Sequence, residues 1–256
     1  MGMLFEAPEI KMPPRAKTLK FMKGRPITTE EFERMLKVTS KVVGEEFADG
    51  WKYLLCGLWE SGLRRAEALD FWWDRSDKPT PRYLESANQH PVIFIPAACE
   101  KGNEDRELPI TPQFAKHLLE TPKSERTGKV YSPGLKRQLA KHPSSQSVGR
   151  VVTRIGKRAN VKVSEKLDDK TGEATVKFAS AHDLRRSFGD RLSKMPGINS
   201  RILKGLMRHK TVLTTEKFYL SDDAQEMGGV LNKAFANTIA NSGQSDLKKE
   251  GLPQSS

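Results

Sequence analysis

The segment from Ala181 to Leu220 constrains this chain most, because it sets several reactive side chains at helical spacing within one stretch. His182 and Arg185 stand one helical turn apart, and His209 and Tyr219 follow them. Arginine offers a phosphate a planar fork of donors, while histidine both donates a hydrogen bond and moves a proton. A tyrosine hydroxyl close by can act as a nucleophile. This grouping indicates chemistry on a phosphodiester.

The charge of the chain favours the same kind of partner. Lys and Arg total 44 against 32 Asp and Glu, which gives a net charge of +12 and an isoelectric point near 9.7. Such an excess favours a polyanion, although a solvated basic surface explains the charge alone equally well. The 256 residues, of which 36% are apolar, suffice for one large folded domain or two small ones.

The apolar periodicity predicts a mainly helical fold. A capping box at Thr28 to Glu31 begins a helix predicted over residues 29–43, and a second apolar stripe runs from Phe47 to Trp59. Trp51 and Trp59 in that stripe are predicted to lie in the core. The same reading predicts further helices over residues 112–120, 147–160, 182–195, 200–207 and 223–240, and one carrying Tyr219.

Strand patterns are fewer. Pro91 to Ala98 is predicted to form a buried strand and Arg106 to Ile110 its partner, joined by a polar turn from Glu100 to Asp105 that begins near Lys101. A further turn is predicted at Asp168 to Gly172, between two short polar segments. The expected fold class is therefore mainly α with a small antiparallel β-sheet, an α+β arrangement.

Several classes of protein are disfavoured. Cys56 and Cys99 lack metal-ligand spacing, so we expect no metal site and a reduced, cytoplasmic setting. The longest apolar stretch, Leu54 to Trp59, is far shorter than the roughly 20 residues that a membrane span needs. Met1 to Arg25 shows no apolar segment of a secretory signal. We therefore expect no membrane partner.

Four motifs occur along the chain in an informative order. They are Ser61-Gly62-Leu63-Arg64-Arg65-Ala66-Glu67, the hairpin Glu100-Lys101-Gly102-Asn103-Glu104-Asp105-Arg106-Glu107-Leu108-Pro109, His182-Asp183-Leu184-Arg185, and Leu206-Met207-Arg208-His209. Over roughly residues 26 to 235 the chain resembles the tyrosine recombinase, or phage integrase, family. Its catalytic domain carries an Arg-x-x-Glu, a hairpin lysine, a His-x-x-Arg, a second histidine or a tryptophan, and a tyrosine nucleophile. Each motif alone is common, but all of them in order make a strong signal.

This resemblance implies a fold like the tyrosine recombinase catalytic domain and a catalytic set. The set comprises Arg64, Lys101, His182, Arg185, His209 and Tyr219. Glu67 would hold Arg64 in place, and Lys101 would give a proton to the departing 5′ oxygen. Tyr219 would cut one DNA strand as a 3′-phosphotyrosine and the strand would then be rejoined elsewhere, with neither metal nor nucleotide cofactor. The implied partners are double-stranded DNA and further protomers in a tetrameric synapse, in a bacterial nucleoid or a phage-encoded system.

Neighbouring basic residues offer alternatives. Arg65 and Arg186 compete with the two proposed arginines, but on a helix they point about 100° away. The helix predicted over residues 147–160 is basic along one face, through Arg150, Arg154, Lys157 and Arg158. That face suits a DNA backbone, and a solvated helix face is nearly as good an explanation.

The resemblance also implies domains, and the chain departs from it in three ways. The expected divisions are a basic arm or linker over residues 1–25, a catalytic domain over 26–222, a C-terminal helix over 223–240 and a disordered tail over 241–256. The family usually has a core-binding domain of roughly 100 residues before the catalytic domain, for which this chain has no room. Arg208 replaces a usual glycine, and the tyrosine normally nine positions after the second histidine is here Phe218, with Tyr219 tenth. A catalytically silent DNA-binding relative and a topoisomerase-like DNA relaxer therefore remain alternatives.

Overall fold

The computed structural model describes residues 24–99, 103–134, 143–167 and 174–208. Seven α-helices, two short 3₁₀ helices (Ala97–Cys99 and Lys123–Glu125) and five strands are defined within these ranges. The helices are α1 (Thr29–Val43), α2 (Glu45–Ser61), α3 (Arg65–Leu69), α4 (Pro112–Leu119), α5 (Ser145–Arg158), α6 (Ala181–Ser193) and α7 (Ser200–Met207). The strands are β1 (Thr80–Arg82), β2 (Val92–Ile95), β3 (Arg106–Pro109), β4 (Lys162–Leu167) and β5 (Ala174–Phe178). None of the helices in the described ranges is long and apolar enough to cross a membrane.

The helix α2 is the centre of the helical body, with α1, α4 and α6 packed around it. Trp51, Leu54, Leu55 and Leu58 on this helix are completely buried, as the apolar stripe predicted. Trp59 lies parallel to Phe32 of α1, with 4.4 Å between the ring centroids. The indole nitrogen of Trp51 donates a hydrogen bond to the Gly134 carbonyl at 2.8 Å. Both tryptophans therefore belong to the core, as expected.

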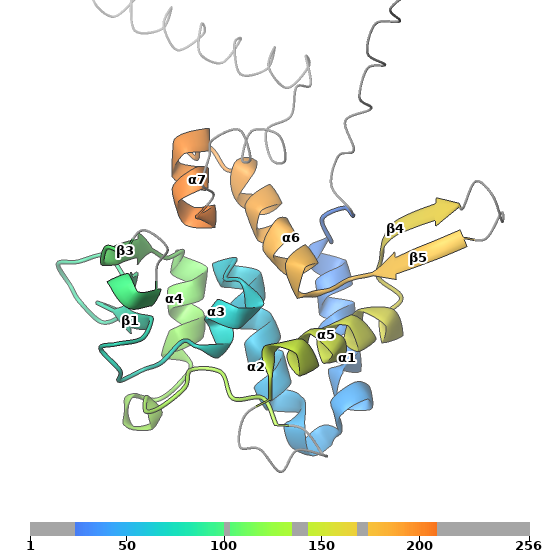
Figure 1. Ribbon diagram of the computed structural model, residues 1–256, viewed down its shortest axis with the longest axis horizontal. Coiled ribbons are helices and arrows are strands. Elements are labelled where there is room, and N and C mark those ends of the chain that lie inside the picture. The colour runs from blue at the N-terminus through green and yellow to red at the C-terminus, as the bar shows by residue number, and fades with distance from the viewer. Residues whose placement is uncertain (1–23, 100–102, 135–142, 168–173, 209–256) are drawn as a thin grey trace, which may run out of the picture.

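The strands form two separate antiparallel sheets on opposite sides of the helices (Figure 1). In the first sheet β2 lies between β1 and β3, with Val92 opposite Pro109 and Ile95 opposite Arg106. The predicted strand from Pro91 to Ala98 is shorter than expected, because Pro96 has no N–H to donate to a ladder and a turn of 3₁₀ helix (Ala97–Cys99) follows it. The other sheet, the hairpin of β4 and β5, flanks the predicted turn at Asp168 to Gly172.

The helices α6 and α7 pack against each other through a second, smaller apolar cluster. Its buried members are Phe188, Leu192, Leu203 and Met207. The segment that precedes α1 is hydrogen-bonded to α6, because the Ile27 N–H donates to the Ser187 hydroxyl at 2.8 Å. The predicted helix over residues 223–240, the helix carrying Tyr219, the arm up to residue 23 and the polar tail lie outside the described residues.

Candidate functional site

The turn after α2 sets the position of the first predicted catalytic arginine. Gly62 ends α2 in the left-handed conformation, at φ 60° and ψ 17°, which favours glycine because it lacks a β-carbon. Leu63 then turns into the core and is 3% exposed. Arg64 follows immediately before α3, with half of its side chain exposed. This short helix was not predicted, because its five residues give too little periodicity to detect.

The Glu67 carboxylate holds Arg64 at two points. One oxygen accepts the Arg64 backbone N–H at 2.6 Å, and the other accepts Nη1 of the Arg64 guanidinium at 2.8 Å. Burial alone would raise the pKa of the Glu67 carboxyl, but the charge of Arg208 and the hydrogen bonds from Arg64 outweigh it and hold that pKa below its usual range. Glu67 is therefore ionised at neutral pH and fixes the direction of a guanidinium at the surface.

Arg185 is buried beneath this turn, with 5% of its surface exposed. Its Nη1 donates to the Gly62 carbonyl and its Nη2 to the Met207 carbonyl, although the two carbonyls come from distant parts of the chain. The planar fork of arginine suits two acceptors at once. Arg185 thus joins the segment that carries Arg64 to the end of α7, the point from which the chain continues to His209.

His182 lies in the first turn of α6 and is exposed at the surface. The partial burial of its ring and then the charge of Arg186 lower the pKa of His182 below its ordinary value. The imidazole is consequently neutral at pH 7, the form that can accept a proton or donate a single hydrogen bond.

The competing arginines have structural partners. Nε of Arg65 donates to the Ser145 hydroxyl at 2.9 Å, and its guanidinium lies across Gly149, where a β-carbon would come within 2.0 Å of it. Arg186 pairs with the fully buried Asp183. Arg65 therefore links α3 to the beginning of α5, and Arg186 forms an ion pair within α6.

Three of the predicted catalytic residues, Lys101, His209 and Tyr219, lie outside the described residues. The structure defines the strands β2 and β3 that flank Lys101, and the residue that precedes His209. Of the predicted set, it therefore brings together the segments of Arg64, Glu67 and Arg185.

Arg208 is a member of this cluster that the sequence did not suggest as a site residue. Its Nη2 donates to the Glu67 carboxylate, and 7% of its side chain is exposed. In the sequence it stood out only as a replacement for a glycine. The replacement is visible in the sequence, but the residue that Arg208 binds, Glu67, lies 141 positions away along the chain.

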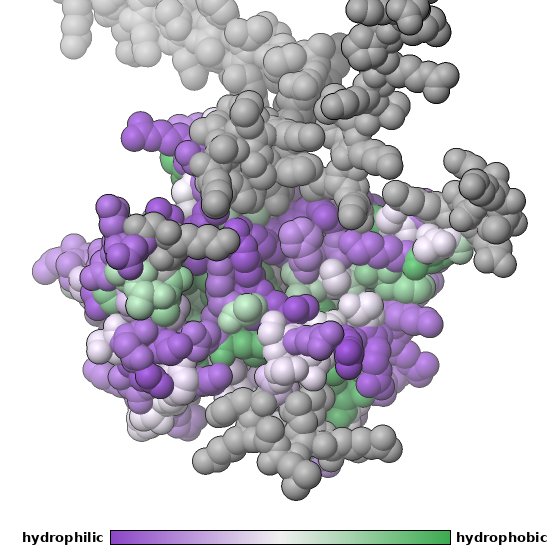
Figure 2. All heavy atoms as spheres, viewed as in Figure 1, coloured by the Kyte–Doolittle hydropathy of each residue, from purple (hydrophilic) through white to green (hydrophobic). Residues whose placement is uncertain are grey.

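The helix α5 carries the predicted basic face. Arg150, Arg154, Lys157 and Arg158 are all exposed, while Val148, Val152 and Ile155 on the opposite face are completely buried. Hydrophilic side chains cover much of the surface in the region of α5 (Figure 2). Because Arg65 links α3 to Ser145, the helix begins beside the segment that carries Arg64. The basic face and the arginine cluster therefore belong to neighbouring elements.

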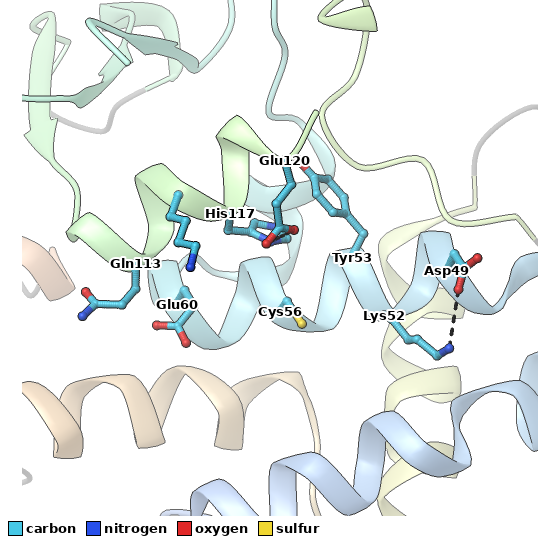
Figure 3. A pocket seen from close by; sticks show the side chains of 9 residues that line it. Asp49, Lys52, Tyr53, Cys56, Glu60, Gln113, His117 and Glu120 are labelled. Atoms are coloured by element: carbon cyan, nitrogen blue, oxygen red, sulfur yellow. Dashed lines mark hydrogen bonds and ion pairs between the residues drawn. The ribbon is translucent and has the colours of Figure 1, made fainter. Parts of the chain in front are cut away.

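A separate hollow of about 440 Å³ lies between α2 and α4. Tyr53 and Cys56 enter it from α2, and His117 and Glu120 from α4 and its end (Figure 3). His117 is 4% exposed, and its ring is 4.2 Å from that of Tyr53 between centroids. Burial lowers the pKa of His117 to about 4 and raises that of the Cys56 thiol to about 11. Both groups are neutral at pH 7, which is typical of structural side chains.

No three His, Cys, Asp or Glu side chains in the described part of the chain gather as ligands of a metal ion would.

Comparison with protein families gives one match. The model of the phage integrase family fits residues 25–226. A search of curated proteins finds no match.

Solved structures share the fold. The Tn1549 transposon integrase in complex with transposon right end DNA superposes with a TM-score of 0.53 at 16% identity, over 83% of this chain and 66% of that one. The XerH site-specific recombinase bound to its difH substrate before cleavage gives a TM-score of 0.50 at 18% identity, over 80% of this chain and 53% of that one. The chain thus spans two thirds or less of the length of these structures.

Proposed function

This chain belongs to the phage integrase family, and we propose that it is a site-specific recombinase that cuts and rejoins DNA through a 3′-phosphotyrosine. The observation that carries the proposal is the meeting of three separate motifs in one place. The Gly62 carbonyl accepts from Arg185, 123 positions away, and Glu67 accepts from both Arg64 and Arg208. Three of the four motifs that the sequence presents in order thus adjoin one another in space.

The chemistry follows from what this cluster offers a phosphate. In the proposed reaction the tyrosine oxygen bonds to phosphorus, the bond to the 5′ oxygen breaks, and negative charge grows on the non-bridging oxygens. Preorganised cations stabilise such a state most. Arg64 faces the surface with its guanidinium held by Glu67, so it can donate to those oxygens without first being ordered. Arg185 lies directly beneath the turn that carries Arg64, where its charge adds to the positive potential. Its hydrogen bonds to two backbone carbonyls hold that turn in its conformation.

Proton transfer requires further groups. The pKa of His182 is lowered, so its neutral ring can accept a proton as a general base. The resemblance assigns Lys101 to protonate the departing 5′ oxygen, His209 to donate to the phosphate, and Tyr219 to attack. The free tyrosine hydroxyl is about 0.1% ionised at neutral pH, so the site must stabilise the phenolate or take up its proton.

We further propose double-stranded DNA and other protomers of the same chain as partners, with a tetrameric synapse as the working assembly. The exposed basic face of α5, formed by Arg150, Arg154, Lys157 and Arg158, would contact the phosphate backbone. The family membership and the neighbouring positions of α3 and α5 support this arrangement.

A second function is favoured by one specific residue. Phe218 stands nine positions after His209, where the family has its tyrosine. Tyr219 lies one residue beyond that position, which on a helix turns its side chain by about 100°. If the hydroxyl consequently misses the phosphate, the chain would bind DNA without cutting it. The chain would then be a catalytically silent DNA-binding relative.

The test is covalent capture on nicked suicide duplexes taken from the DNA that flanks the coding sequence. The parent should form an adduct that survives denaturing gels, Tyr219→Phe should form none, and Tyr83→Phe, which removes a hydroxyl elsewhere, should match the parent. An adduct with Tyr219→Phe would disprove the assignment of the nucleophile. DNA binding without any adduct from the parent would favour the silent relative, and relaxation of supercoiled plasmid without strand exchange would favour a topoisomerase-like enzyme.

A further inference from the structure

The last helix in the described ranges ends in an unusual residue. Arg208 caps α7 in the left-handed conformation, at φ 48° and ψ 46°, and its backbone N–H donates to the carbonyls of Lys204 and Gly205. Glycine is the usual residue at such a helix end, because a β-carbon there costs about 1–2 kcal/mol. A long charged side chain at this position therefore needs a compensating contact.

The contact is made with the residue that also holds Arg64. Nη2 of Arg208 donates to Oε2 of Glu67, the same oxygen that accepts the Arg64 backbone N–H. The other oxygen, Oε1, accepts the Arg64 guanidinium at 2.8 Å. One carboxylate thus receives two arginine side chains, of which Arg208 is nearly buried and Arg64 is half exposed.

The difference in exposure separates the roles of the two arginines. A half-exposed guanidinium can reach a ligand, whereas a side chain that is 7% exposed and paired with a carboxylate is suited to hold that carboxylate. Fixing Glu67 from a second side limits the rotamers open to it and, through Oε1, the directions open to the Arg64 guanidinium.

The end of α7 is held at two neighbouring residues, Met207 and Arg208. The Met207 carbonyl, one residue earlier, accepts from Arg185. The backbone two residues before His209 is therefore hydrogen-bonded to Arg185, and the side chain of the residue directly before His209 is paired with Glu67.

We propose that Arg208 is a positioning residue, which holds Glu67 and thereby orients Arg64 toward the phosphate and fixes the chain where it enters His209. The contribution of Arg208 to cleavage rests on the proposed function, whereas its interaction with the Glu67 carboxylate does not. Two measurements on the full chain separate these statements.

The first measurement is independent of DNA cleavage. The side-chain carboxyl of Glu67 is titrated by carbon-13 NMR in the parent and in Arg208→Gly, which suits the left-handed backbone and removes only the side chain. Loss of the neighbouring positive charge should raise the pKa of Glu67. Arg201→Ala, which removes an exposed arginine from the same helix, should leave it unchanged. An unchanged pKa in Arg208→Gly overturns the proposal even if the protein cuts no DNA.

The second measurement is single-turnover cleavage of the suicide duplex beside DNA affinity. Arg208→Gly should cleave about ten- to a hundredfold more slowly while its Kd for duplex changes less than about twofold, because a misdirected guanidinium harms the transition state more than binding. Added guanidinium ion should restore part of the rate to Arg208→Gly, and Arg201→Ala should cleave like the parent.

Coupling to Glu67 completes this test. If Arg208 acts through Glu67, the double variant Arg208→Gly with Glu67→Gln should be no slower than the slower single variant. Parental cleavage by Arg208→Gly, or effects of the two changes that multiply independently, would overturn the positioning role. A parent that forms no adduct would instead count against the proposed function and leave the NMR result to decide whether Arg208 holds Glu67.

Discussion

The ring of Phe188 lies against Gly62 so closely that a β-carbon on this glycine would come within 2.2 Å of the ring's Cδ1. Gly62 also has a positive φ, and its carbonyl accepts from Arg185. Three separate requirements thus meet at the residue that directs the chain from α2 to Arg64.

Gly62→Ala should therefore destabilise the protein by roughly 2–5 kcal/mol, the sum of left-handed strain and overpacking. Gly128→Ala is the matched control, because Gly128 has a φ of 70° but no atom of the described residues lies within 4 Å of the position its β-carbon would take. The control should lose only about 1–2 kcal/mol. Urea unfolding of both variants measures the difference, and equal losses would show that contact with Phe188 is unimportant.

Lysine substitutions should distinguish the two arginines. Arg185→Lys should unfold more easily by about 1–3 kcal/mol, because lysine cannot keep both buried carbonyls satisfied. Arg64→Lys, at a half-exposed side chain, should change stability by less than about 1 kcal/mol. Both should cleave DNA about a hundredfold more slowly or worse. Near-parental cleavage by either variant would remove that residue from the proposed catalytic set.

Stability should decrease in acid partly through His117. Burial lowers its pKa to about 4 in the folded protein, below the value of about 6.5 for an unfolded histidine. Between these values the unfolded chain binds a proton that the folded protein does not, so stability falls as the pH falls from about 6.5 to about 4, by at most about 3 kcal/mol. His117→Phe should flatten this part of the curve of unfolding free energy against pH. The exposed His90→Phe should not, and a matching slope in both variants would rule out His117.

The basic face of α5 should set the salt dependence of DNA binding. We expect a log-log slope of affinity against salt of several units for the parent, measured by fluorescence anisotropy. Replacing Arg150, Arg154, Lys157 and Arg158 with glutamine should reduce that slope by up to about 3–4 units and weaken binding to all sequences alike. Replacing Lys116 and Lys123, exposed on and just after α4, should have little effect. A slope that is unchanged in the α5 variant would exclude this face.

Local patterns in the sequence predicted most of the helices. The helix predicted over residues 29–43 has the bounds of α1, and that over 200–207 has the bounds of α7. Capping side chains lie within three residues of the groups they bind, as Thr28 does with the Glu31 N–H. The apolar stripe of α2 likewise depends only on spacing along the chain. Such features can be read without knowing what else the helix contacts.

The chain by itself thus determined most of the described helices, the antiparallel pairing of the two segments that flank Lys101, and the order of the motifs that carry Arg64 and Arg185. Only the tertiary structure decided that Arg185 binds two carbonyls, that Arg208 shares Glu67 with Arg64, and that the polar segments around residues 168–173 pair as β4 and β5. A left-handed Arg208 looks unfavourable in isolation. It is tolerated because packing brings a carboxylate from 141 positions earlier in the sequence to its side chain, a contact that no local pattern contains.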